Sequence, residues 1–75
     1  MQRYTNRSGE SGVLAYELGP DWIAVKFAEG AVYRYDAERP GRPVVAEMKR
    51  LAERGSGLST YISRVVQGNF AKKWR

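Results

Sequence analysis

The chemistry open to this chain is limited by two residue types that it lacks. Its 75 residues include no histidine and no cysteine, so the usual general base, thiol nucleophile and zinc ligands are missing. The hydroxyl side chains that follow Gly55 have no partner base in the sequence, and an N-cap is the simpler role for such serines; they are Ser56, Ser59, Thr60 and Ser63. We therefore expect a protein that is not an enzyme and that uses no cofactor and no metal.

Cations and aromatic residues remain as candidates for recognition, and the cations are concentrated in the second half of the chain. Residues 39–75 carry nine Lys and Arg against two Glu, whereas residues 1–38 carry four against six. A basic half favours polyanionic partners, namely RNA, DNA or an acidic protein surface. Cations bind phosphates, and an accessible indole stacks on unpaired bases. The candidates here are Arg54, Arg64, Lys72, Lys73, Trp74 and Arg75. The alternative is a solvated basic surface, with Trp74 packed back onto the domain.

The glycine loop at 55–57 is a weaker candidate for phosphate binding. The loop lacks the Lys-Ser/Thr pair that follows the glycines of a phosphate-binding loop. Its amides at the start of a helix are still suited to one backbone phosphate.

Alternating apolar residues predict the strands that must position these side chains. The strands are expected at 13–18, 22–27 and 31–37, separated by turn residues at 19–21 and 28–30. In the first of them, Leu14, Tyr16 and Leu18 are expected to share the inner face.

Two helices are expected after the strands. The first begins at Pro43, ends at Gly55, and buries Val44, Met48, Leu51 and Ala52. The second is capped by Gly68 and buries Leu58, Ile62, Val65 and Val66. We thus predict an α+β fold, a three-stranded antiparallel β-meander followed by two α-helices packed on one sheet face. Residues 13–68 form this single domain, between a polar arm (1–12) and a basic aromatic tail (69–75).

The turn at 28–30 decides which way the central tyrosines point. A turn over Ala28-Glu29, followed by Gly30 in the left-handed conformation, demands only what glycine adopts freely. That turn pairs Val25 with Tyr33 and Ile23 with Tyr35, and a shift by one residue would reverse every side chain. Both tyrosines then join the predicted core, which includes Tyr16, Phe27, Tyr33, Tyr35, Leu51, Leu58 and Ile62.

The same register assigns a second group of recognition candidates to the opposite face of the sheet. Trp22, Lys26 and Arg34 alternate with the core residues. A tryptophan flanked by two cations on an uncovered sheet face is suited to stacking on a base while neutralising phosphates. The alternative is a solvated face on which Arg34 pairs with a neighbouring acid.

A longer pattern resembles a known family. The segment FAEGAVYRY (27–35) fits F-x-x-G-x-x-Y-x-Y, the central signature of the KTSC domain, named for the C-terminus of some lysyl-tRNA synthetases. Tyr16 matches the aromatic residue of that family's first strand, and GSGLSTYISRVV (55–66) with the following NFA (69–71) resembles its glycine loop and second helix. The resemblance covers roughly residues 8 to 71. It implies RNA as the class of partner and implies no reaction.

These observations lead to two hypotheses. The first is a small cytoplasmic RNA-binding module of low sequence specificity, acting by electrostatics and aromatic stacking. The second is a protein-interaction domain that docks an acidic partner of the translation or transcription machinery. No apolar run approaches the roughly 20 residues of a membrane-spanning helix, so no membrane association is expected.

Overall fold

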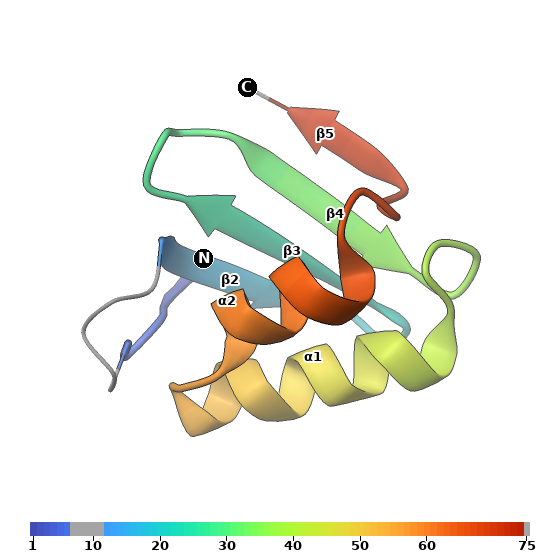
Figure 1. The fold of residues 1–75 in the computed structure, drawn as a ribbon, viewed down its shortest axis with the longest axis horizontal. Coiled ribbons are helices and arrows are strands. Elements are labelled where there is room, and N and C mark those ends of the chain that lie inside the picture. The colour runs from blue at the N-terminus through green and yellow to red at the C-terminus, as the bar shows by residue number, and fades with distance from the viewer. Residues whose placement is uncertain (7–11, 75) are drawn as a thin grey trace.

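The computed structural model describes residues 1–6 and 12–74 of the chain. A sheet is covered on one side by two helical segments (Figure 1). In chain order the elements are β1 (Gln2–Arg3), β2 (Val13–Leu18), β3 (Trp22–Phe27), β4 (Val32–Asp36), α1 (Arg42–Arg54), α2 (Leu58–Tyr61), the π-helical turn η1 (Ile62–Val66) and β5 (Lys72–Trp74).

The α+β architecture is confirmed, but the predicted number of strands is wrong. The described residues form a five-stranded antiparallel sheet in the order β1-β2-β3-β4-β5. The two additional strands come from the segments expected to be an arm and a tail. They supply the two edges of the sheet, with β1 beside β2 and β5 beside β4 (Figure 1).

The β3–β4 hairpin has the predicted register. Gly30 has a φ of 100°, and its N–H donates to the carbonyl of Phe27 at 2.8 Å. Ile23 pairs with Tyr35, and Val25 pairs with Tyr33. Tyr35 is therefore buried under the helices, with 1% of its surface exposed, and Tyr33 is half-buried against the core.

Strand β2 departs from simple alternation. Its register with β3 shifts between Val13 and Ala15, so two residues of β2 oppose one residue of β3. As a result Val13 and Tyr16 are buried, while Leu14 is 47% exposed. The prediction that Leu14 faces the core was wrong because the bulge rotates this residue outward.

Helix α1 follows its predicted pattern closely. Proline lies in its first turn, and Gly55 ends it in the left-handed conformation, its N–H donating to carbonyls of the last turn. The buried residues are Val45, Met48, Leu51 and Ala52, with Val44 half-buried. Lys49 joins the helix to the β2–β3 turn, because its Nζ donates to the carbonyls of Gly19 and Pro20.

The α-helical part of the second helical segment is shorter than predicted, and it continues into a turn of wider, π-helical geometry. After four α-helical residues the chain enters η1, where the N–H of Gln67 donates to the carbonyl of Ile62, five residues back. The wider turn keeps Leu58, Ile62 and Val66 on the buried face and leaves Val65 56% exposed. The prediction that Val65 is buried was wrong for this reason. The C-terminal cap is Gln67, with a φ of 52°, and not Gly68.

Tyr4 connects the N-terminal strand to the helical layer. Its ring is buried against Tyr16 in an edge-on contact, with 6.5 Å between centroids. Its hydroxyl accepts a hydrogen bond from the backbone N–H of Leu58 at 3.3 Å. Since the first amides of a helix lack partners within the helix, Tyr4 supplies one to α2 from the opposite end of the chain.

Candidate nucleic-acid interface

The sheet face that no helix covers collects the cations and tryptophans of several strands. Cross-strand pairing places Arg3, Ala15, Lys26, Val32 and Trp74 in one row and Glu17, Ala24, Arg34 and Lys72 in the next. Trp22 and Asp36 form a third row. We call this set of residues the open face.

Strand β5 is the element that assembles the open face. It pairs with β4 so that Lys72 lies opposite Arg34 and Trp74 lies opposite Val32. The N–H of Ala71 donates to the carbonyl of Arg34 at 2.8 Å and helps to hold the strand there. Two candidate groups that are separate in the sequence therefore share one surface.

Trp22 lies at one end of this surface in contact with Arg34. The Arg34 guanidinium carbon is 4.8 Å from the centroid of the indole ring, which is a cation–π contact. The indole lies against the backbone of Gly19, where an added Cβ would come within 1.9 Å of ring atoms. Ala24 is only 6% exposed although no helix covers it, which indicates that its neighbours on the open face close over it.

Trp74 lies on β5 with a cation of its own. The Nζ of Lys72 is 5.1 Å from the centroid of the Trp74 ring. The indole is 41% exposed, so part of its surface is accessible to a ligand. Trp74 thus combines an accessible ring with a neighbouring positive charge.

The charges of the open face favour an anionic ligand. Arg34 and Lys72 lie directly opposite each other, and like charges in that arrangement disfavour the sheet. Within residues 1–6 and 12–74 no carboxylate forms an ion pair with Lys26, Arg34 or Lys72. Asp36 lies on the same face, but its carboxylate accepts the backbone N–H groups of Glu38 and Arg39.

Three of the predicted binding residues that the structure describes lie away from the open face. Lys73 points to the helix side of the sheet, where its Nζ is 5.3 Å from the Tyr33 ring centroid. Arg54 lies in the last turn of α1, on the covered side of the sheet. The hydrogen bond from Arg50 lowers the pKa of Glu47, and the positive charges of Arg50 and Arg54 lower it further. Arg64 is exposed on η1. Arg75 lies outside the described residues.

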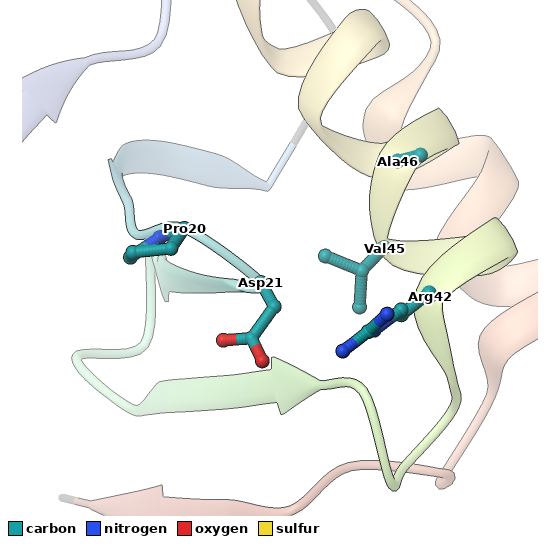
Figure 2. Close-up of a pocket in the computed structure, with 5 residues that line it drawn as sticks. All are labelled: Pro20, Asp21, Arg42, Val45 and Ala46. Carbon is teal, nitrogen blue, oxygen red and sulfur yellow. The ribbon is translucent and has the colours of Figure 1, made fainter.

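A pocket of about 480 Å³ lies between the β2–β3 turn and the start of α1 (Figure 2). Arg42 reaches from the first turn of α1 toward the side on which Asp21 lies, and Pro20, Val45 and Ala46 complete the lining. This combination offers one carboxylate and one guanidinium on apolar walls. In the described part of the chain, no three His, Cys, Asp or Glu side chains gather where they could hold a metal.

Comparisons with protein-family models, with curated proteins and with solved structures gave no match. The resemblance to the KTSC domain therefore stays a prediction from the motif residues. Among residues 1–6 and 12–74, no helix is long and apolar enough to cross a membrane.

Proposed function

We propose that the open face binds single-stranded RNA with little sequence preference, in a cytoplasmic setting. The observation that supports this most directly is the pairing of β5 with β4, which brings Lys72 and Trp74 beside Arg34 on an uncovered sheet. With Trp22, Lys26 and Arg3, the surface carries two indole rings and four cations.

Each part of this surface has a role in the proposed complex. The exposed part of the Trp74 ring stacks on an unpaired base, which is worth about 1–3 kcal/mol per base by alanine substitution. A phosphate between Arg34 and Lys72 neutralises two charges that otherwise repel each other. Duplexes are disfavoured because their bases are already stacked and cannot reach the indoles.

Low specificity follows from the kinds of side chain present. The open face contains no Asn or Gln, the side chains that pair with an adenine edge through two hydrogen bonds. Stacking and phosphate contacts tolerate any sequence. The choice of RNA over DNA is supported by the resemblance to the KTSC domain, for which RNA binding has been proposed.

The test is fluorescence anisotropy with a labelled oligouridylate at several salt concentrations. Three or four neutralised phosphates give a log–log salt slope of about −2 to −3. Lys72→Ala should reduce the magnitude of this slope by about 0.7. Lys73→Ala is the matched control, because it removes the same charge from the next residue of β5, on the other face of the sheet. It should change the slope much less.

Two results would contradict the proposal. One is the absence of binding at low salt. The other is an equal effect of Lys72→Ala and Lys73→Ala, which would show that total charge matters and the open face does not. Trp74→Phe should retain most of the affinity, since it keeps an aromatic ring, whereas Trp74→Ala should lose it.

A protein partner is the second candidate function, and the edge position of β5 favours it. Edge strands can pair with an added strand of a partner, and Lys72 and Lys73 would attract an acidic one. Pull-down from lysate, with and without nuclease, separates the two functions. A partner protein that stays bound after nuclease treatment supports this alternative, whereas RNA recovered with the protein supports RNA binding.

A further inference from the structure

A second pocket, of about 230 Å³, lies on the helix side of the sheet and is separate from the open face. It is bounded by the end of the β3–β4 hairpin and by the segment that joins η1 to β5. Its walls include Phe27, Glu29, Tyr33, Tyr35, Gln67 and Phe70. This volume is smaller than that of pockets for drug-sized ligands, so the pocket is suited to one small chemical group.

Aromatic rings meet at right angles around this pocket. Phe27 and Phe70 stand at 89° and 81° to the Tyr33 ring, with centroid distances of 5.3 and 4.8 Å. Tyr35 is nearly parallel to Tyr33, at 18°. All four of these aromatic residues line the pocket, and aromatic side chains are the groups that hold quaternary ammonium ligands.

The charges at the pocket agree with a cationic occupant. Glu29 is exposed at the hairpin turn, and no cation of the described residues forms an ion pair with it. Tyr33 already has an ammonium group near its ring, since the Nζ of Lys73 is 5.3 Å from the centroid. Lys73 is not among the residues that line the pocket, so the charge that the pocket itself contributes is the carboxylate of Glu29, which favours a cation.

The backbone beside the pocket is strained. Gln67 has a φ of 52° and a ψ of −127°, a region that favours glycine. It directly follows the π-helical turn η1, and such turns are frequent at functional sites. Strain of this kind is found at ligand-binding positions, where the surrounding structure maintains it.

We propose that this pocket binds an alkylated ammonium group. Such a group has an apolar shell that fits among aromatic rings, a charge that is attracted by their faces and by Glu29, and no N–H that demands an acceptor. Two sources carry this chemistry, a free quaternary amine such as choline and a trimethylated lysine side chain. The proposal is independent of RNA binding, because the pocket and the open face lie on opposite sides of the sheet.

The test is an NMR titration of the intact protein with choline and with 3,3-dimethylbutan-1-ol, its neutral carbon analogue. Choline should shift the Gly68 amide and the ring signals of Tyr33 and Phe70 with saturation. The neutral analogue should bind about fivefold more weakly than choline, which is the loss in affinity that corresponds to one cation–π contact. Equal affinity for both compounds, or no saturable shift with either, would overturn the proposal.

Variants connect the binding to the pocket. Glu29→Gln is exposed and should not affect folding, and it should weaken choline binding several-fold while leaving the neutral analogue unchanged. An unchanged choline affinity in Glu29→Gln would contradict the proposal, which has this carboxylate attract the ammonium charge. Trp74→Ala is the control and should leave choline binding unaltered.

A peptide with one trimethyllysine, compared with its unmethylated form, distinguishes the two sources. Tighter binding of the methylated peptide than of choline assigns the pocket to a protein side chain. Tighter binding of choline assigns it to a free amine. Equal binding of both peptides, without choline binding, contradicts the proposal.

Discussion

Replacing Gln67 with glycine should stabilise the protein. The N–H of Asn69 donates to the carbonyl of Val66 at 3.0 Å, so Gln67 is the first central residue of a four-residue turn. Its dihedral angles of 52° and −127° are close to those of the first central position of a type II′ turn, where glycine is preferred.

The size of the effect follows from two opposing terms. A residue with a side chain in a sparsely populated backbone region costs about 1–3 kcal/mol. Glycine gives back about 0.4–1 kcal/mol through the greater freedom of the unfolded chain. The Gln67 side chain is exposed, so its removal costs little packing. We expect a net gain of about 1 kcal/mol, which raises the melting temperature by about 4–8 °C in a domain of this size.

Urea unfolding followed by circular dichroism measures this gain as a higher midpoint at unchanged slope. Gln67→Ala is the matched control, because it removes the side chain and keeps the Cβ that causes the strain. Its stability should stay within about 0.5 kcal/mol of the original protein. A glycine variant that is no more stable, or an alanine variant that gains as much, would refute the argument from backbone strain.

Three further predictions concern individual side chains. Tyr4→Phe should lower stability by about 1 kcal/mol in urea unfolding, because the buried N–H of Leu58 loses its acceptor; an unchanged midpoint would contradict this role. Burial, followed by the neighbouring Tyr33, raises the pKa of Tyr35 from 10.0 to about 12. The unfolded chain then releases this proton first, so stability should fall as the pH rises from 10 toward 12, and Tyr35→Phe should remove that part of the fall; identical pH profiles would contradict it. Gly19→Ala should displace the Trp22 indole, because the new Cβ would lie 1.9 Å from the ring. An unchanged tryptophan emission spectrum would contradict the contact between the Trp22 ring and the Gly19 backbone.

The central hairpin and the first helix could be predicted from the sequence because local signals agree there. Gly30 is compatible with one turn and hence with one register, and alternation then assigns both tyrosines to the covered face. Helix α1 combines regular apolar spacing with a proline at its start and Gly55 at its end. In each case a single short segment contains all of the information.

The edge strands could not be predicted in this way. Strands β1 and β5 have two and three residues, too few to show alternation, and they form because β2 and β4 offer unpaired backbone groups. The one available signal was Tyr4, a large aromatic residue in an otherwise polar segment. Its partner, Leu58, is distant in the sequence.

The candidate interface was predicted in parts and assembled only by the fold. Trp22, Lys26 and Arg34 follow from the hairpin register alone. Lys72 and Trp74 join them because β5 pairs with β4, a contact between segments that no local pattern indicates. The bulge at Leu14 and the π-helical turn likewise depend on packing with other elements.

The length of the short connection before β5 determines which side chains of this strand lie on the open face. Side chains of a strand point alternately to its two sides, so Lys72 and Trp74 share one side and Lys73 has the other. Deleting Ala71, without a compensating bulge, would turn each side chain of β5 to the opposite side of the sheet. Trp74 would then lie opposite Tyr33 on the helix side of the sheet, and Lys73 would take the position of Lys72 opposite Arg34 on the open face. The spacing of this segment is therefore as much a part of the binding surface as the residues that contact the ligand.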